Sequence, residues 1–352
     1  MSKNALNVSI ESFFKNSIQD YKPNFKHIHW ENLHNSFNFD SDIFSRLKFM
    51  RSNELTTGFD NSNTSDGKLI TTKEIERVLK RIHSDIPSNL LSESNIGHPL
   101  RKMHADFMVS KSSLKSAYHL SSLIKLFGAD RIKNIRNCVE IGGGFGGLAK
   151  ILSTYCCNST IYLYDLPETN VCSAYFLAKS FPEYQPIAKN DSFFLIDKNG
   201  FTRFATRPAW RINELEIESV DLVINISSFM EMEIPIVNNY LAEAQRILVN
   251  NGLFYSANRD SKYKKSWEKN KPFILSDLDY GNNWNLSNIF TKYDNFQITE
   301  FGLYKSKTAN VDLNKTLKQT YINKYSKRID KKIIRFFKRY LTNVDVIKYP
   351  HF

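Results

Sequence analysis

Short apolar runs and amphipathic segments alternate along the chain from residue 136 onward. Each apolar run is short enough to form one buried strand. The runs cover residues 139–141, 160–164, 220–226 and 253–257. After the first run, apolar residues recur from Leu148 to Tyr155 at the three- and four-residue spacing of a helix. This β-α-β-α order predicts an α/β fold with a doubly wound parallel sheet.

The residues before this alternation carry helical patterns. Thr71 and Glu74 have the spacing of a capping box, which predicts a helix through residue 82. A one-sided apolar face from Leu114 to Ile124 predicts a second helix, with Gly128 as its stop. The expected organisation is a mainly helical N-terminal region or cap at 1–110, an α/β domain at 111–306 and a helical tail at 307–352.

Two further patterns predict the flanks of the sheet. Asn199-Gly200 stands between the apolar residues 193–196 and 201–205, which predicts a hairpin or a strand entry. Residues 273–275 and 296–303 are apolar runs that predict its last strands.

The tail has one apolar and one basic face. Apolar residues recur every three or four positions, and residues 313–341 hold ten Lys or Arg and one Asp. This segment supplies +9 of the net charge of +12, so the rest of the chain is close to balanced. A basic amphipathic helix can lie on an anionic membrane, bind RNA, or dock its apolar face on the body or on a second copy. The sequence leaves these alternatives open.

The bulk composition is that of a soluble globular protein, with 41% apolar and 24% charged residues in 352. No run approaches the roughly 18 apolar residues that span a bilayer, and the first residues lack the apolar stretch of a secretory signal. The four cysteines show no C-x-x-C spacing, so we expect buried free thiols. These features predict a cytoplasmic protein, with residues 313–341 as a candidate peripheral contact at the inner face of the membrane.

The strongest functional signal is a strand that leads through a carboxylate into a glycine cluster, at residues 139–147. Glycines allow a tight turn and close approach to a ligand. Gly142, Gly144 and Gly147 fit G-x-G-x-x-G, and Asp165 follows at the distance of a ribose-binding carboxylate, which makes a dinucleotide one candidate ligand. Glu140 favours a different ligand, because a carboxylate repels a pyrophosphate and attracts a cation.

The same loop resembles motif I of class I S-adenosylmethionine-dependent methyltransferases. Four segments together are similar to the sugar O-methyltransferase family of bacterial polysaccharide gene clusters, over residues 97–304. These segments are E-I-G-G-G-F-G-G-L-A at 140–149, D-L-P-E at 165–168, S-F-M-E-M at 228–232 and S-A-N-R at 256–259. The resemblance implies a Rossmann-like, doubly wound, seven-stranded methyltransferase sheet.

The resemblance also implies S-adenosylmethionine as the cofactor. This molecule carries a sulfonium cation and no phosphate, which suits a site with two carboxylates. Glu140 and the glycine backbone would hold the methionine end, and Asp165 would take the ribose hydroxyls, with a helix cap as its alternative role. The residues assigned to the cofactor are Glu140, Gly142, Gly144, Gly146, Asp165, Leu166 and Asn225.

Methyl transfer to a hydroxyl needs alignment of the acceptor oxygen and a base for its proton. Glu231 is the candidate base, with a solvated helix-start carboxylate as the alternative. Arg259 is the candidate contact to sugar hydroxyls or a linked phosphate, with a surface salt bridge as the alternative. Other acceptor contacts are Tyr118, Ser228 and Asn258; rival bases are His98, His104 and His119; candidate stacking platforms are Trp210 and Trp284.

A metal site has no support from residue spacing. Asp277 and Asp279 could contribute to a Mg²⁺ site, and His27-x-His29 has no acidic or thiol partner at a convincing spacing. We therefore expect no metal among the site residues.

The sequence predicts an S-adenosylmethionine-dependent O-methyltransferase for a sugar, nucleotide-sugar or glycan acceptor in surface polysaccharide biosynthesis. Asn225-Ile226-Ser227-Ser228 stands where amino-methylating nucleic-acid enzymes have N-P-P-Y, and no cysteine stands there to attack cytosine, so DNA is not an expected partner. The alternatives are an RNA-binding methyltransferase that uses the tail, a dinucleotide-dependent oxidoreductase, and a cofactor-binding module without activity. The oligomeric state is left open.

Overall fold

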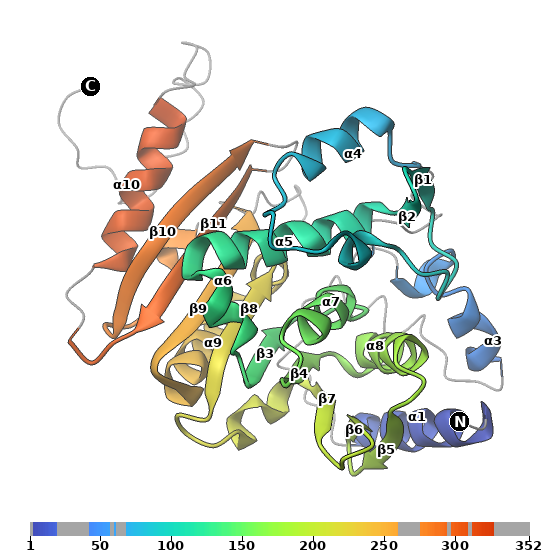
Figure 1. The fold of residues 1–352 in the computed structure, drawn as a ribbon. Helices are drawn as coiled ribbons and strands as arrows, with labels where there is room; N and C mark the ends of the chain where they lie inside the picture. The colour runs from blue at the N-terminus through green and yellow to red at the C-terminus, as the bar shows by residue number, and fades with distance from the viewer. Residues whose placement is uncertain are drawn as a thin grey trace, which may run out of the picture.

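A computed structural model describes residues 3–19, 42–56, 60, 68–259, 275–293, 297–308 and 312–326. A nine-stranded sheet in the order β10-β11-β9-β8-β3-β4-β7-β6-β5 forms the centre, and β1 and β2 form a two-stranded sheet (Figure 1). The strands are β1 (Lys102–His104), β2 (Phe107–Val109), β3 (Asn137–Ile141), β4 (Thr160–Asp165), β5 (Gln185–Lys189), β6 (Ser192–Ile196), β7 (Thr202–Pro208), β8 (Val220–Ile226), β9 (Leu248–Arg259), β10 (Trp284–Tyr293) and β11 (Gln297–Lys305).

Five parallel strands make up the middle of this sheet. β3 pairs with β4 on one side and with β8 on the other. The chain continues outward from β4 to β7, then returns to build β8 and β9 on the opposite side. The strand order therefore reverses at β3, and in such sheets ligands bind at the carboxyl ends of the strands beside that reversal. The predicted doubly wound α/β arrangement is confirmed.

The sheet has nine strands, where the sequence predicted seven. The additional pair is β5 and β6, which continue the sheet beyond β7 through antiparallel pairings. The hairpin predicted at Asn199-Gly200 joins β6 to β7. β5 escaped prediction because it is short and contains Pro186, a residue that a sheet accommodates at an outer strand.

The opposite flank is also antiparallel, because β11 lies between β9 and β10 and runs against both. The strand predicted at residues 273–275 is wrong at Leu275, which begins the 3-10 helix η7 (Leu275–Asp277); residues 273 and 274 lie outside the described residues. Leu275 is buried in the core, so its apolar character reflects packing of a helical turn and not a strand.

Helices cover both faces of the sheet. The α-helices are α1 (Lys3–Gln19), α3 (Ile43–Lys48), α4 (Thr72–Leu79), α5 (Lys111–Phe127), α6 (Ala129–Lys133), α7 (Gly147–Tyr155), α8 (Pro167–Ser180), α9 (Ile234–Ile247) and α10 (Leu313–Ser326). The other 3-10 helices are η2 (Glu54–Thr56), η4 (Ser88–Leu91), η5 (Ala209–Glu214) and η6 (Phe229–Glu231). Side chains of α1, α3 and α5 to α8 pack on one face, and those of η5, α9, η7 and α10 pack on the other.

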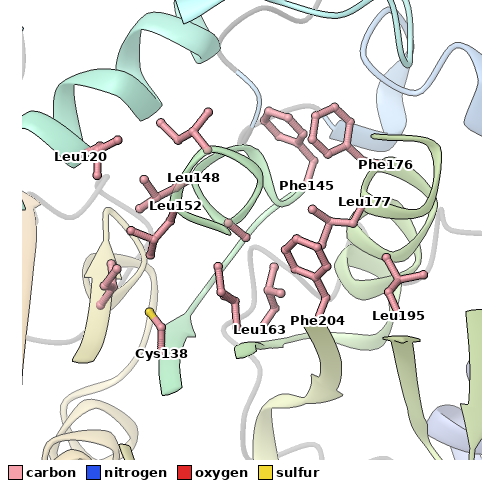
Figure 2. Close-up of a cluster of buried hydrophobic side chains, with 14 of the residues drawn as sticks. Leu120, Cys138, Phe145, Leu148, Leu152, Leu163, Phe176, Leu177, Leu195 and Phe204 are labelled. Carbon is pink, nitrogen blue, oxygen red and sulfur yellow. The ribbon is translucent and has the colours of Figure 1, made fainter. Parts of the chain in front are cut away.

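Adjacent strand residues enter opposite core clusters, as the two-residue period of a strand requires. Cys138 belongs to the cluster with α5 to α8, and Val139 belongs to the cluster with α9. Figure 2 shows Leu163 and Phe204 below the helices that carry Leu148 and Leu177. All four cysteines are free thiols, and three are buried as expected, whereas Cys157 is exposed.

The N-terminal region contributes helices and the β1–β2 hairpin, which the sequence did not predict. The capping box of Thr71 and Glu74 is confirmed at the start of α4, although this helix ends at Leu79 and not at residue 82. Leu6 and Leu47 share a core cluster with side chains of α5 to α8. The predicted division of the chain at residues 110 and 306 stays a prediction.

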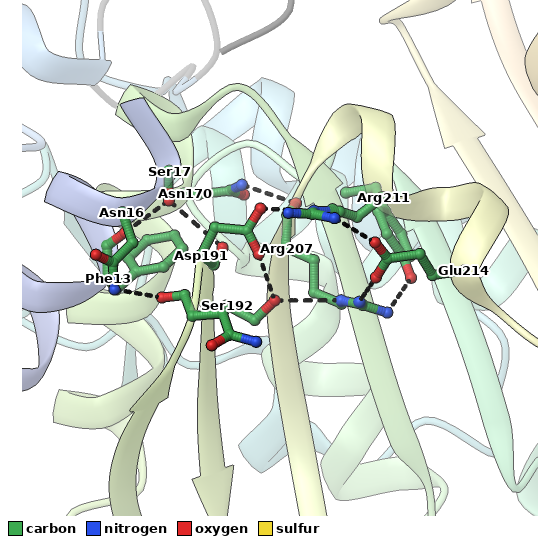
Figure 3. Close-up of polar contacts among 11 residues, drawn as sticks. Phe13, Asn16, Ser17, Asn170, Asp191, Ser192, Arg207, Arg211 and Glu214 are labelled. Carbon is green, nitrogen blue, oxygen red and sulfur yellow. Dashed lines mark hydrogen bonds and ion pairs between the residues drawn. The ribbon is translucent and has the colours of Figure 1, made fainter. Parts of the chain in front are cut away.

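A polar cluster joins α1 to the β5–β6 turn (Figure 3). The Asn16 side chain donates a 2.8 Å hydrogen bond to the Asn190 carbonyl. Next to it, Arg211 in η5 forms ion pairs of 2.6 Å with Asp191 and 2.5 Å with Glu214. The cluster therefore fixes the two additional strands between the N-terminal helix and the segment after β7.

The start of the tail packs on the body of the protein. Leu313 and Leu317 on α10 are buried in the cluster that contains α9. Between them, the Asn314 side chain donates hydrogen bonds of 3.0 Å and 2.7 Å to the carbonyls of Ser276 and Leu278. The first turns of α10 are therefore docked on the body, while residues 327–352 lie outside the described residues.

Candidate active site

The glycine loop connects β3 to α7 at the strand-order reversal. Gly142, Gly144 and Gly146 have φ angles of +74°, +57° and +88°, a region that favours glycine. A Cβ at Gly142 would lie 2.3 Å from the Ser228 hydroxyl oxygen, so the loop also needs glycine there for close approach to the end of β8. The loop leads directly into the N-terminus of α7, which begins at Gly147.

Two carboxylates stand beside this loop on neighbouring strands. Glu140 lies in β3 and is 5% exposed, and Asp165 ends β4. The Asp165 carboxylate accepts hydrogen bonds of 2.9 Å from the Gly144 amide and 2.8 Å from the Leu166 amide. Asp165 thus holds the middle of the glycine loop, and Leu166 takes part through its backbone at the start of α8.

Both carboxylates bind their protons more tightly than exposed ones. Burial, followed by the charge of Asp165, raises the pKa of Glu140 to about 8, and the nearby Lys115 opposes this rise. Burial raises the pKa of Asp165 to about 6, although the amides of Leu166 and Gly144 favour its charged form. A cation placed between them would favour ionisation of both groups.

Amide side chains fix the ends of β3, β8 and β9 relative to one another. Asn225 is fully buried, and its amide nitrogen donates to the Ile141 carbonyl at 3.0 Å and to the Ser228 hydroxyl at 2.5 Å. Its oxygen accepts a 2.8 Å hydrogen bond from Asn258, which is also fully buried. Asn225 therefore holds the end of β3 that leads into the glycine loop, and Asn258 holds Asn225. Ser228 lies directly against the loop.

The other predicted acceptor residues lie around this strand edge at different depths. Glu231 is half-buried in η6, directly after the end of β8, and Arg259 is the exposed last residue of β9. Tyr118 on α5 instead donates a 3.0 Å hydrogen bond to Glu300 of β11, and burial with this carboxylate raises its pKa above the usual value. The structure thus brings Ser228, Glu231 and Arg259 to the edge, and directs the Tyr118 hydroxyl to β11.

The rival candidates have other surroundings. His119 is buried and pairs with the Tyr255 hydroxyl at 2.8 Å, and exposed His98 stacks on Phe49 at 4.6 Å between ring centroids. His104 is half-buried in β1. Trp210 and Trp284 are 3% and 1% exposed, which leaves neither indole face open to a sugar.

No cluster of metal-ligating side chains occurs within the described ranges. Asp279 accepts a hydrogen bond from the Gly281 amide at 2.9 Å, as a turn residue does. The histidines at 27 and 29 lie outside the described residues.

Sequence reasoning missed a buried ionic cluster that lies against the glycine loop. Arg51 is fully buried and forms ion pairs of 2.5 Å with Asp60 and 2.8 Å with Glu93. Its guanidinium also lies 4.3 Å from the ring centre of Phe145, inside the glycine loop. The hydroxyl of Ser110, the N-cap residue of α5, donates to Glu93 at 2.5 Å. The N-terminal region therefore contacts the glycine loop through buried charges.

A lysine on α5 was also missed. Lys115 is half-buried, and its charge lies close enough to interact with Asp60, Glu140 and Arg259. Burial lowers its pKa, the two carboxylates oppose that effect, and Arg259 adds to it. The helical position of Lys115 gave no signal, because a lysine on an amphipathic helix normally faces solvent.

No family model matches the chain, and no curated protein matches it. The chain is distantly similar to several solved structures, some of which are methyltransferases by name. SibL, in its apo form, is 12% identical over 55% of this chain and 57% of its own, with a TM-score of 0.37. Phosphoethanolamine N-methyltransferase 1 of Haemonchus contortus, bound to phosphoethanolamine and S-adenosylhomocysteine, is 13% identical over 58% and 49%, with a TM-score of 0.34.

The PH0226 protein of Pyrococcus horikoshii OT3 is 17% identical over 54% of this chain and 92% of its own, with a TM-score of 0.36. These likenesses are too distant to assign a family or an activity. The chemistry of the site therefore rests on the residues of this chain. Among the described helices, none is both long enough and apolar enough to cross a membrane.

Proposed function

We propose that the protein is an S-adenosylmethionine-dependent O-methyltransferase that acts on a sugar hydroxyl in surface polysaccharide or glycan biosynthesis. The observation that carries the proposal is the pair Glu140 and Asp165 on either side of a glycine loop, with pKa values raised to about 8 and about 6. A cationic ligand beside both carboxyls would stabilise their ionised forms, and S-adenosylmethionine is a cation without phosphate.

The cofactor roles follow from the positions of the side chains. Asp165 ends β4 and is half-buried; each of its oxygens accepts one backbone amide and can accept a second hydrogen bond, from a ribose hydroxyl. Glu140 and the amides of the glycine loop hold the methionine end. Asn225 acts as a positioning residue through the Ile141 carbonyl, which immediately precedes the loop.

A dinucleotide fits this site less well. A pyrophosphate at the glycine loop would stand beside Glu140 and Asp165, and the repulsion would grow in a poorly solvated site.

The RNA-binding alternative depends on basic residues in the tail, of which α10 holds Lys315, Lys318 and Lys324.

The acceptor would lie over the ends of β8 and β9. Glu231 would take the hydroxyl proton as the oxygen attacks the methyl group in line with the departing sulfur. Ser228 and Arg259 would orient the acceptor, with Asn258 as support from below. The sugar class rests on the segments at 228–232 and 256–259, which resemble those of sugar O-methyltransferases.

The proposal is tested by offering the protein S-adenosylmethionine with a labelled methyl group. The acceptor panel holds free sugars, sugar nucleotides, surface glycan and RNA, and products are identified by mass spectrometry. We expect label on a carbohydrate hydroxyl. Glu231→Gln should abolish transfer and leave S-adenosylhomocysteine affinity unchanged, while Glu233→Gln, at an exposed position in the same loop, should transfer normally. Label on RNA alone would contradict the sugar assignment.

A further inference from the structure

We propose that Lys115 and Arg259 form a subsite for an anionic group on the acceptor, a phosphate or a carboxylate, beside the transferred methyl group. This inference rests on the proposed function and names the chemical class of its acceptor. Lys115 lies on α5, and Arg259 ends β9.

The face of α5 that carries Lys115 is turned toward the sheet. Three positions before it, the Ser112 hydroxyl donates to Asp60. One position after it, Ser116 lies against the glycine loop, since a Cβ at Gly147 would come within 3.2 Å of its hydroxyl oxygen. One turn after it, His119 pairs with Tyr255 of β9 at 2.8 Å. Lys115 therefore lies between contacts to the cofactor loop and to β9.

The charges that act on Lys115 come from both halves of the site. Burial lowers the pKa of Lys115, the carboxylates of Asp60 and Glu140 oppose this effect, and the charge of Arg259 on β9 adds to it. β8 separates these two strands in the sheet, so their ends lie roughly 10 Å apart. A side chain on which charges at both ends act stands near the boundary between methyl donor and acceptor.

The nearby carboxylates do not neutralise this lysine. Asp60 is already engaged by Arg51 at 2.5 Å and by the Ser112 hydroxyl. Burial and the charge of Asp165 raise the pKa of Glu140 to about 8, which favours its neutral form at pH 7. A cationic cofactor would pair with its charged form. Within the described residues, the Lys115 side chain forms no hydrogen bond or ion pair.

The charge of Arg259 disfavours the charged form of the half-buried Lys115, as expected for two cations near each other. An anionic oxygen group between them removes this repulsion and accepts charge-assisted hydrogen bonds. Ala257 of β9 pairs with Ile226, the last residue of β8. Arg259 lies two residues further along β9, beyond the end of β8, where the acceptor is proposed to lie. The subsite therefore favours sugars that carry a phosphate or carboxylate over neutral sugars.

The test measures binding to the full-length chain saturated with S-adenosylhomocysteine. Calorimetric titrations use uridine diphosphate as the phosphate probe, glucuronate as the carboxylate probe and glucose as the neutral control. We expect at least one anionic probe to bind and glucose not to bind. Lys115→Met and Arg259→Gln should each weaken anion binding by roughly 10- to 100-fold, whereas Lys115→Arg should retain most of it.

Lys111→Met is the matched control, since Lys111 lies one turn earlier on the same helix and faces Glu74. It should leave anion binding within about twofold, and Lys115→Met should weaken S-adenosylhomocysteine binding much less than it weakens anion binding. Equal losses of anion and S-adenosylhomocysteine binding would overturn the inference, because Lys115 would then hold the cofactor carboxylate. Absence of anion binding in a protein that binds S-adenosylhomocysteine would also overturn it. Failure to bind S-adenosylhomocysteine at all would instead refute the proposed function.

Discussion

Burial, together with the charge of Asp165 on the neighbouring strand, raises the pKa of Glu140 to about 8. Burial makes the ionised form of such a carboxyl unfavourable unless a ligand with a positive charge binds beside it. The two groups differ in their surroundings, since Asp165 receives two backbone amides and retains a lower pKa. At the scale of single residues, the site therefore suits a cationic ligand better than a phosphate.

The raised pKa of Glu140 predicts how stability depends on pH. Its pKa rises from the ordinary 4.5 to about 8 on folding. Between these values the folded protein binds a proton that the unfolded chain releases, so the free energy of unfolding falls as pH rises, by at most about 1.4 kcal/mol per pH unit. Urea unfolding of the ligand-free protein from pH 5 to 8 should show this decline, and Glu140→Gln should flatten it. An unchanged slope in the variant would assign the decline to other groups.

Gly142→Ala tests the close approach of the glycine loop to β8. The new Cβ would meet the Ser228 hydroxyl at 2.3 Å, in addition to the strain of a φ of +74°. We expect S-adenosylhomocysteine affinity to fall at least about tenfold. Gly200→Ala is the control, because Gly200 has a φ of +82° but no atom within 4 Å of the added Cβ. The control should lose about 1–3 kcal/mol of stability and keep its affinity. Equal affinity in both variants would contradict this account of the loop.

At the scale of elements, buried charges tie the N-terminal region to the α/β core. Arg51 sits after α3, Glu93 follows η4, and Phe145 belongs to the loop after β3. Removal of one partner from such a cluster leaves the others buried and unpaired, which costs more than an exposed pair ever contributes.

Arg51→Met should therefore destabilise the protein by about 3–5 kcal/mol, because Asp60 and Glu93 would lose their buried counter-charge. Lys15→Met removes the exposed pair with Glu11, and should cost at most about 1 kcal/mol. Denaturant midpoints of the two variants measure the difference. A loss in Arg51→Met no larger than that in Lys15→Met would show that the cluster is not structural.

The elements that sequence reasoning found are those with local patterns. The glycine loop, Asp165 and the α4 capping box each lie within a short stretch with a defined spacing, and so were readable. The Arg51 cluster was not, because its ion pairs join residues 9 and 42 positions apart with no repeating pattern. The buried amides of Asn225 and Asn258 were recognised as site residues, but their mutual hydrogen bond depends on strand register.

At the scale of the whole molecule, the sheet brings the site residues together, and the first turns of the tail pack on the body. Asp165, Asn225 and Arg259 come from three different strands, yet parallel order brings their carboxyl ends to one edge. The tail begins as a docked helix, since Leu313 and Leu317 are buried. Membrane contact through residues 313–341 stays a prediction, as does the cytoplasmic location.

Two truncations separate the docked part of the tail from the rest. Deletion of 327–352 should leave the unfolding temperature and S-adenosylhomocysteine affinity unchanged, whereas deletion of 313–352 should destabilise the protein, because each buried leucine contributes about 1.5–3 kcal/mol. Calorimetry measures both. If the tail recruits the protein to membranes, the full chain should co-sediment with anionic vesicles and the 327–352 deletion should not. Equal vesicle binding by the two proteins would rule out recruitment by this segment.

The cofactor is the central claim, and a calorimetric titration with S-adenosylhomocysteine and with NADH tests it most directly. The account predicts micromolar or tighter binding of S-adenosylhomocysteine, no binding of NADH, and a large loss of affinity in Asp165→Ala, which removes the carboxylate beside Gly144. Binding of NADH without binding of S-adenosylhomocysteine would contradict the account, and would assign the glycine loop to a dinucleotide.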